Sequence, residues 1–432
     1  MRNRRIAALA AMLVLVAAPA GAGPLNLPAL PGVVGGVVNR TTGTLNQSLN
    51  SVDQTLTTTL HDAVGRPRGG SSPRALDKDV NGFRIVRGEI LALSPSDESL
   101  AIARGLNFEI VRQDTLASLG MSVIVLRVPE GTSASDGLAT LRKADPDGAY
   151  DVDHVYDPSG GAAEKSAVAS TEASAARDGI RIGMIDGGVQ QDHKAFAGAS
   201  IISQGFIANG TSVPTTHGTA VASLLVGSDD DVSGALPGAR LYAADVYCGR
   251  ADGGSADAIA GALAWLAQNN VPVANVSLSG PPNAILSAAV NAFLRRGHVL
   301  VAAVGNDGPA AGVEYPAGYP GVAGVTAVDD KHGIQLEANR GADVAFAARG
   351  VEVSAASLHD RHDTVTGTSF AAPIVAARFA LLMPRPDPHA AANAWTTLER
   401  AALHLGPPGR NDTYGFGFLD RPPSLINATA AR

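Results

Sequence analysis

The chain has 432 residues, of which 45% are hydrophobic and 17% are charged, enough for two or three domains with buried cores. The net charge of -7 and the absence of an extended Lys/Arg cluster in the sequence argue against a nucleic-acid partner. A single cysteine, Cys248, excludes an internal disulfide framework and any cysteine-rich metal site.

Residues 1–22 have the composition of a secretory signal peptide. Arginines at positions 2, 4 and 5 precede an apolar run at 6–18, and small residues follow up to Ala22. The run is too short to span a bilayer, and no other segment of the sequence reaches the roughly 18 apolar residues of a membrane helix. We therefore predict an exported protein, secreted or periplasmic, without a transmembrane anchor after signal removal.

Residues 23–83 are rich in Gly, Ser, Thr and Asn, which predicts a low-complexity linker. Within it, Leu and Val residues between positions 45 and 64 recur at helical spacing, which leaves open a short amphipathic helix. The polar face of that helix consists mostly of poor helix formers, so the pattern does not decide between helix and coil.

Residues 84–157 show a compact alternation of strands and helices. Strands are expected at 85–93, 107–112, 121–128 and 150–156, with helices at 96–104 and 135–143. This β-α-β-β-α-β order predicts a small α+β sandwich of the ferredoxin-like type.

The rest of the chain divides into a short connection and a large domain. Residues 158–177 are small and polar, and they predict an exposed connection of the kind that proteases cut. In residues 178–432, continuously apolar strands alternate with helices, which is typical of parallel strands buried on both faces. We predict an α/β fold with a mostly parallel open sheet, helices on both faces, and a site beyond the carboxyl ends of the strands.

Four polar residues of the large domain are flanked by glycine or other small residues. Asp186 ends a predicted strand and His217 starts an apolar helix. Asn306 follows another strand, and Ser369 opens a further helix. Each has an ordinary structural explanation as a turn, core or helix-cap residue. Together they supply a nucleophile, a base for its proton, a carboxylate to orient the base and an amide for an oxyanion.

The sequence around these four residues resembles the subtilase family of subtilisin-like serine endopeptidases. The matching motifs are DGG at 186–188, HGTAVA at 217–222, GN at 305–306 and GTSFAAP at 367–373, in the chain order Asp, His, Ser. The resemblance covers roughly residues 178–425 and implies hydrolysis of peptide bonds by Asp186, His217 and Ser369. It also implies that Asn306 helps to bind the oxyanion, and it implies no cofactor.

The same resemblance implies a peptide-binding cleft. Residues 275–280 (NVSLSG) are similar to the family's substrate-binding strand, and residues 248–254 (CGRADGG) to the segment facing it across an extended peptide. The implied substrate-binding residues are Ser277, Leu278, Ser279, Gly280, Gly249 and Gly305. Residues 414–417 (YGFG) are similar to the motif that closes the family's domain.

The unit at 84–157 lies where subtilases carry a propeptide. The resemblance therefore implies an autoprocessed precursor whose prodomain acts as an intramolecular inhibitor, with proteins or peptides as substrates. The small-residue composition of the connection adds a prediction of self-cleavage between about 157 and 178.

Two residues depart from the family pattern. Gly187 stands where Ser or Thr is common, which predicts a looser hydrogen bond near Asp186. Ser279 stands where glycine is usual, which predicts a narrower or altered pocket. Neither removes a catalytic group, yet both leave open a catalytically idle binding protein on the same scaffold. An esterase with the same triad is a further alternative, which the strand at 275–280 disfavours.

Three other motifs are predicted to have no catalytic role. HDRHD at 359–363 carries two histidines three residues apart, and DDD at 229–231 offers carboxylates that suit calcium. HDRHD lies in a connection before the Ser369 turn, and DDD does not align with a calcium site of the family, so we predict solvated loops. A structural calcium ion is left open without a recognisable site. GMIDGG at 183–188 lacks the full glycine spacing of a dinucleotide-binding turn.

Overall fold

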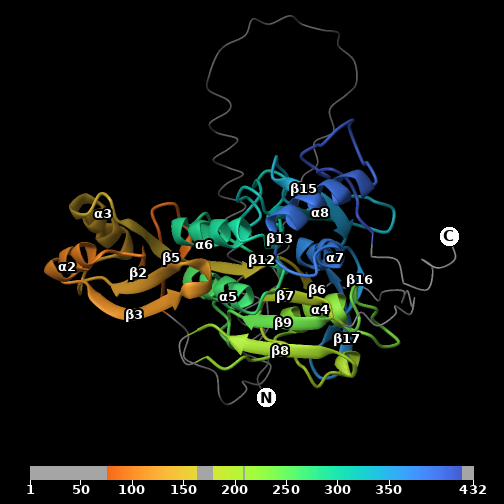
Figure 1. Cartoon of the computed structure of the whole chain (residues 1–432), viewed down its shortest axis with the longest axis horizontal. Coiled ribbons are helices and arrows are strands. Elements are labelled where there is room, and N and C mark those ends of the chain that lie inside the picture. Colours follow the sequence, from red (N-terminus) through yellow and green to blue (C-terminus); the bar gives the residue numbers. More distant parts are fainter. Residues whose placement is uncertain (1–74, 163–178, 208–209, 421–432) are drawn as a thin grey trace, which may run out of the picture. The chain divides into compact units, whose positions relative to one another are not determined.

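The computed structural model describes residues 75–162, 179–207 and 210–420. In these residues the chain forms a small N-terminal α+β domain that ends at Pro158 and a larger α/β domain that starts at residue 179 (Figure 1). The predicted signal peptide at 1–22, the predicted helix between 45 and 64, and residues 163–178 of the predicted connection lie outside the described residues.

The small domain is an antiparallel sheet with two helices on one face. Its elements are β2 (Arg84–Leu93), α2 (Asp97–Gly105), β3 (Glu109–Leu116), β4 (Met121–Arg127), α3 (Ala134–Ala144) and β5 (Ala149–Pro158). Ser96 and Ser133 cap the two helices, because their side chains accept backbone N–H groups of the first turns. The strand order β5-β2-β4-β3 confirms the predicted ferredoxin-like arrangement.

The two faces of this sheet contribute to different cores. Ile90 and Ile124 pack with residues of α2 and α3, whereas Leu91 and Val123 belong to a core of the large domain. Neighbouring strand residues point to opposite faces, which explains the division. The small domain is therefore docked on the large one through an apolar sheet face.

The sheet of the small domain includes residues before position 84. β1 (Leu76–Lys78) pairs antiparallel with residues 84–86 of β2. The end of the expected 23–83 linker thus belongs to the sheet of the small domain. A strand of three residues is too short to show a reliable hydrophobic alternation, which explains why the pattern missed it.

The large domain is built on a parallel sheet of seven strands. They are β7 (Arg181–Asp186), β8 (Ser200–Gly205), β9 (Arg240–Asp245), β11 (Val273–Val276), β13 (Val299–Ala303), β14 (Ala323–Val328) and β15 (Val344–Arg349). All neighbours in the order β15-β14-β13-β11-β7-β9-β8 are parallel. The predicted mostly parallel open sheet is confirmed.

Helices cover both faces of this sheet (Figure 1). They are α4 (Thr216–Val226), α5 (Ala256–Gln268), α6 (Ala284–Arg295), α7 (Thr368–Leu382) and α8 (Pro388–Ala401). Met184 of β7 packs in a core with residues of α4 and α7, whereas its neighbour Ile185 packs with residues of α5 and α6. This alternation places α4 and α7 on one face and α5 and α6 on the other.

Two small sets of strands lie outside the central sheet. β16 (Val353–Ser357) and β17 (Arg361–Thr366) form a hairpin, and β17 also pairs with β6 (Gly161–Ala162). β10 (Gly254–Ser255) and β12 (Leu278–Ser279) both pair with β5 of the small domain. The expectation of a solvated loop at 359–363 is wrong for residues 361–363, which belong to β17.

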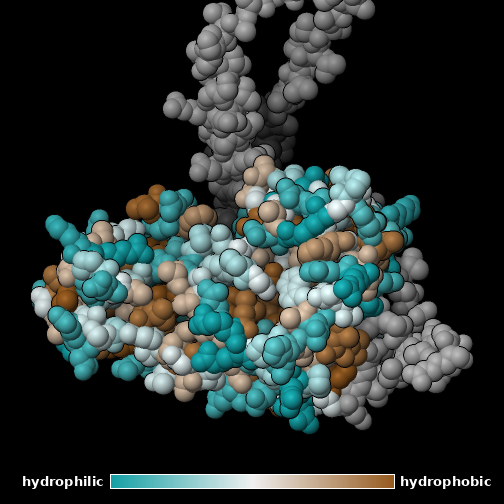
Figure 2. Space-filling view, turned by 45° about the horizontal axis from the view of Figure 1, so that its top comes forward, coloured by the Kyte–Doolittle hydropathy of each residue, from teal (hydrophilic) through white to brown (hydrophobic). Residues whose placement is uncertain are grey.

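The face shown in Figure 2 carries hydrophobic residues as separate patches among hydrophilic ones. Across residues 75–162, 179–207 and 210–420, no helix has the length and apolar character needed to cross a bilayer.

Candidate active site

Asp186 and His217 form a hydrogen-bonded pair at the carboxyl edge of the central sheet. Asp186 ends β7 and is fully buried, and His217 is the second residue of α4. His217 Nδ1 lies 2.9 Å from Asp186 Oδ1 and 3.0 Å from Oδ2. A carboxylate accepts hydrogen bonds, so Nδ1 carries the proton and Nε2 keeps its lone pair.

His217 Nε2 is placed to act as a base. It is buried and has no hydrogen-bond partner among the described residues. The ring also packs against Phe370, with 5.2 Å between ring centroids. Asp186 thus fixes the imidazole ring through Nδ1, and Nε2 is left without a hydrogen-bond partner among the described residues.

Ser369 is the second residue of α7, where backbone N–H groups at the helix start lack partners within the helix. Its Oγ donates to the carbonyl oxygen of Ser277 at 2.9 Å. Within the part of the chain that the structure describes, Ser369 Oγ forms no hydrogen bond with His217. The hydroxyl would have to turn about its Cα–Cβ bond to donate to Nε2.

Asn306 follows β13 and lies against the first turn of α7. Its Oδ1 accepts the backbone N–H of Thr368 at 3.1 Å and the Nε2–H of Gln335 at 3.1 Å. Its Nδ2 is buried without a partner among the described residues. The side-chain amide is held at its oxygen end and keeps its donor end for another group.

The chain itself runs through the cleft between β10 and β12. Tyr156 pairs with Gly254, and Asp157 pairs with Ser279. The backbone N–H of Ser159 then donates to Ser277 O at 3.2 Å. An extended segment is therefore added as a strand between two edges, as a bound peptide would be.

The carbonyl group of Ser159 lies at the start of α7. Its oxygen accepts the backbone N–H of Ser369 at 3.0 Å. A Cβ added to Gly160 would lie 2.8 Å from Phe370 Cε2 and 3.2 Å from Gly367 Cα, so the chain passes very close to this turn. Ser159 is only 3% exposed. The expectation of an exposed connection from residue 158 onward is wrong for Ser159, which is enclosed in the cleft.

The side chain of Ser159 meets a polar pair. Its Oγ donates to Ser279 Oγ at 2.7 Å, and the half-buried carboxyl group of Glu314 lies next to Ser279. Burial, together with the nearby carboxylates of Asp307 and Asp157, raises the pKa of Glu314 to about 7, although the Ser279 hydroxyl acts in the opposite direction.

The predicted substrate-binding residues fall into two groups. Ser277, Leu278 and Ser279 contact the chain's own segment at residues 157–159. A Cβ on Gly280 would meet the Tyr156 ring at 2.7 Å, and one on Gly305 would lie 2.5 Å from Glu314 Oε2. These glycines therefore line the same region as the other three.

Gly249 does not share this position. A Cβ added to Gly249 would contact the Val213 side chain at 3.2 Å, and the edge that pairs with β5 is at Gly254 and Ser255. The contact with β5 is therefore made by Gly254 and Ser255, which lie further along the chain than Gly249.

The geometry explains Gly187. A Cβ at this position would lie 2.3 Å from Thr215 Oγ1, which caps α4 by accepting the backbone N–H of Gly218 at 3.0 Å. Asp186 keeps a hydrogen bond of 2.6 Å from the Gly187 N–H. The expected loosening around Asp186 is not seen, because backbone and histidine donors hold the carboxylate.

The two motifs expected to be solvated loops come together. His362 of β17 lies 2.9 Å from Asp229 Oδ2 and 3.4 Å from Asp231 Oδ2. One ligand atom from each residue lies within 4.8 Å of the others, which is compatible with a cation. Lys194 also lies 3.5 Å from Asp231. The cluster can equally be a set of ion pairs that ties β17 to the loop after α4.

Three contributors to the site were missed from the sequence. Ser159 and Glu314 gave no signal, because their role depends on contacts far along the chain. Asp245 ends β9 and accepts backbone N–H groups of Val213 and Cys248, each at 2.8 Å. Its burial raises its pKa despite these donors. Its place at the end of a parallel strand was the available signal.

The parallel sheet with helices on both faces is the fold of a subtilisin-like serine peptidase. A model of the subtilase family matches residues 177–417, more than half of the chain. The chain belongs to the subtilase family.

Sequence relatives agree with this assignment. Subtilisin DY of Bacillus licheniformis is 32% identical over 262 residues, which cover 58% of this chain and 90% of that protein. The minor extracellular protease Epr of Bacillus subtilis is 30% identical over 245 residues, covering 56% of this chain but 37% of that protein. The chain thus spans about a third of Epr and most of subtilisin DY.

The fold is also similar to a solved structure. Fervidolysin from Fervidobacterium pennivorans, described as a keratinolytic enzyme related to subtilisin, superposes with a TM-score of 0.65. The match covers 80% of this chain and 64% of fervidolysin at 18% identity, so it speaks for the fold alone.

Proposed function

We propose that the chain is an exported serine endopeptidase made as a self-processing precursor. The observation that carries this proposal is the 3.0 Å hydrogen bond from the Ser369 N–H to the Ser159 carbonyl oxygen. It holds a peptide carbonyl at a helix start, where donors stabilise the charge that develops during acyl transfer. Any protein or peptide substrate would bind in the same extended form between β10 and β12.

The proposed reaction uses four residues. Ser369 Oγ attacks the carbonyl carbon, and His217 Nε2 takes the hydroxyl proton. Asp186 holds the tautomer of His217 and stabilises the imidazolium. The Ser369 N–H and Asn306 Nδ2 bind the oxyanion. His217 then gives its proton to the leaving amine, and water hydrolyses the acyl-serine ester.

Within the precursor, the bond in the reactive position joins Ser159 to Gly160. We infer that this bond is the first one cleaved, which narrows the predicted region of 157–178 to a single position. Cleavage would leave β5 in the cleft on one side of Ser369 and a new amino terminus at Gly160 on the other. The small domain would then be a product-bound inhibitor.

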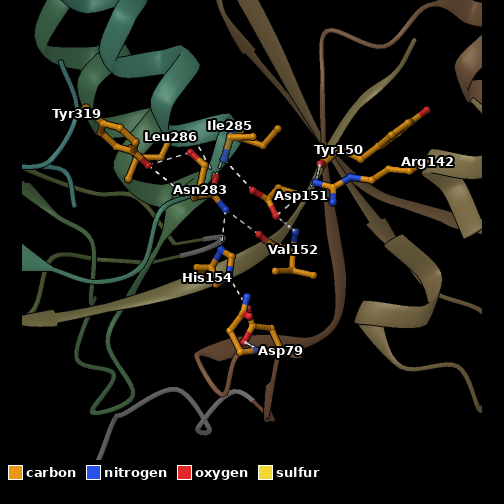
Figure 3. Close-up of polar contacts among 12 residues, drawn as sticks. Asp79, Arg142, Tyr150, Asp151, Val152, His154, Asn283, Ile285, Leu286 and Tyr319 are labelled. Atoms are coloured by element: carbon orange, nitrogen blue, oxygen red, sulfur yellow. Dashed lines mark hydrogen bonds and ion pairs between the residues drawn. The ribbon is translucent and has the colours of Figure 1, made fainter. Parts of the chain in front are cut away.

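A polar interface supports the inhibitor role (Figure 3). Asn283 caps α6 and also donates from Nδ2 to Val152 O at 2.9 Å, and it lies 3.0 Å from His154 Nδ1. Asp151 accepts the backbone N–H of Ala284 at 2.7 Å. Two groups of β5 thus bind the start of α6 independently of the peptide bond, so cleavage leaves them intact.

Mass spectrometry of the expressed full chain tests the proposal. The wild type should yield a fragment that begins at Gly160, and Ser369→Ala should stay uncut there. Ser287→Ala, on a half-buried face of α6, is the matched control and should mature like the wild type. Equal processing of Ser369→Ala and the wild type, or a first cut elsewhere, would contradict self-cleavage at this bond.

Two alternative functions make different predictions. The orientation of Ser369 Oγ toward Ser277 O favours an idle binding protein, for which a fluorophosphonate probe should not label Ser369 after removal of the small domain. An esterase with the same residues should turn over a short ester far better than casein. Labelling of Ser369 together with casein cleavage would exclude both alternatives.

A further inference from the structure

We propose that the pocket for the residue before the cleaved bond selects a serine side chain through a hydroxyl relay from Ser279 to Glu314. The inference rests on the proposed peptidase function and names the residue that this site accepts. It starts from the one peptide that the structure places in the cleft, the chain's own residues 156–160.

The backbone of Ser159 is held on both sides. Its N–H donates to Ser277 O at 3.2 Å, and its carbonyl oxygen accepts the Ser369 N–H at 3.0 Å. These two bonds fix the direction in which the Cβ of any residue at this position points. The groups that meet the Ser159 side chain are therefore those that meet every substrate side chain bound here.

The first of these groups is the hydroxyl of Ser279. It accepts from Ser159 Oγ at 2.7 Å, and it lies next to the carboxyl group of Glu314, whose pKa it lowers. Ser159 is 3% exposed and Ser279 is 9% exposed, so water competes little for either hydroxyl. The relay ends at the carboxyl group of Glu314, which can accept further hydrogen bonds. Two hydroxyl groups that donate in series require such a final acceptor.

Glu314 closes the pocket on the side of the oxyanion residues. A Cβ on Gly305 would lie 2.5 Å from Glu314 Oε2, so the carboxyl group packs directly against the backbone that precedes Asn306. The space at this end of the pocket is thus already taken by a polar side chain. A large apolar side chain would have to displace Glu314 and bury both polar groups without partners, which is costly.

Serine satisfies this arrangement better than its competitors. An alanine at position 159 would remove the donor that Ser279 Oγ accepts, and an unsatisfied buried polar group weakens binding about tenfold. A lysine ammonium could pair with Glu314, but Ser279 stands between them and would have to move. A site built around a hydrogen-bonded substrate hydroxyl discriminates strongly against analogues without it.

The test uses the full chain, with its own junction as the substrate. Ser159 is changed to Ala, Thr, Phe or Lys, and the first-order rate of cleavage before Gly160 is measured for each. We expect the serine chain to be fastest and Ser159→Ala to be about tenfold slower, with Phe and Lys slower still. A faster rate for Phe or Lys would overturn the inference.

Changes in the pocket separate the relay from a general structural effect. Ser279→Gly should bring the ratio of the Ser159 and Ser159→Ala rates close to one and should make Ser159→Phe faster. Glu314→Gln keeps a hydrogen-bond acceptor and should preserve the ratio, whereas Glu314→Leu should reduce it. An unchanged ratio in Ser279→Gly would contradict the relay.

A second measurement does not depend on catalysis. In the Ser369→Ala background, hydrogen exchange of the residue 159 amide reports how often the segment leaves Ser277 O. Replacing Ser159 by Ala should speed this exchange about tenfold, and equal exchange would contradict the inference. If Ser159→Ala speeds amide exchange as expected but the wild-type chain never cleaves itself, the peptidase proposal fails and the assignment of the pocket stands.

Discussion

Gly187 leaves room for the Thr215 side chain directly beside the aspartate-histidine pair. Thr215 accepts the Gly218 N–H and so fixes the first turn of the helix that carries His217. The residue after Asp186 and the helix cap therefore compete for one volume. In this chain the cap occupies it, which explains a glycine at position 187.

Gly187→Ser should consequently destabilise the fold. The new Cβ would lie 2.3 Å from Thr215 Oγ1 and 3.0 Å from Tyr247 Cδ2, so the cap must move. We expect a loss of about 1–3 kcal/mol in the free energy of unfolding, measured by urea titration in the Ser369→Ala background. Gly198→Ser is the control, because a Cβ there has no neighbour within 4 Å. Equal stability of the two variants would refute the competition.

Glu314 should make stability depend on pH. Burial and neighbouring carboxylates raise its pKa from 4.5 to about 7 in the folded state, so the folded chain keeps a proton that the unfolded chain releases. Its contribution is fully present below pH 4.5 and is lost as pH rises through about 7. The loss amounts to at most about 3 kcal/mol.

Urea titrations at pH 4.5 and pH 8 in the Ser369→Ala background measure this effect. Glu314→Gln should lose less stability over that interval than the parent, because an amide does not titrate. Glu337→Gln changes an exposed carboxylate and should follow the parent curve. The assignment fails if both glutamine variants keep the same pH dependence as the parent.

At the scale of elements, the edge of the small domain and the start of α6 form one structural unit. Asn283 uses its carbonyl oxygen to cap α6, accepting from Ile285 and Leu286 N–H groups at 3.0 Å. Its amide nitrogen serves β5 at the same time. Asp151 adds a negative charge at the helix amino terminus, which the helix dipole favours.

Asp151→Ala should therefore weaken the hold of the small domain. Losing a charged acceptor at a helix start is expected to cost about 1–2 kcal/mol, or roughly 5- to 30-fold in affinity. After the proposed cut, the small domain should dissociate from the large domain sooner. The delay between the cut and the start of casein hydrolysis should therefore shorten. Asp147→Ala alters an exposed carboxylate of the same domain and should leave the lag unchanged. A wild-type lag in Asp151→Ala would speak against this contact as an anchor.

Elements that form long, continuous apolar runs were predictable from the sequence. The predicted strands before Asp186 and Asn306 and the predicted helix at Ser369 are present as β7, β13 and α7, because continuous burial leaves a continuous apolar run. β8 alternates exposed and half-buried residues at the sheet edge, and its polar composition hid it. The β16–β17 hairpin turns at His359 and Asp360, both with positive φ, without the glycine that usually marks such turns.

At the scale of the whole molecule, the segment in the cleft depends on pairing between residues that are far apart in sequence. Asp157 pairs with Ser279, and Ser159 with Ser277 and Ser369. The groups proposed for the site were predicted from motifs, since each motif is local. The occupied cleft could not be predicted, because nothing in residues 157–160 marks them as a substrate until β5 docks on the large domain.

If the proposed self-cleavage takes place, this intramolecular placement should determine its kinetics. A segment tied to its own cleft has a very high effective concentration, so cleavage within one chain should outpace cleavage between chains. The half-time of the first cut should stay constant when the chain is diluted 100-fold. Tagged Ser369→Ala chains mixed with wild type should remain uncut at Ser159 until the wild type has matured. A half-time that lengthens in proportion to dilution would mean that one molecule cuts another, and Ser159 would then have to leave its own cleft first.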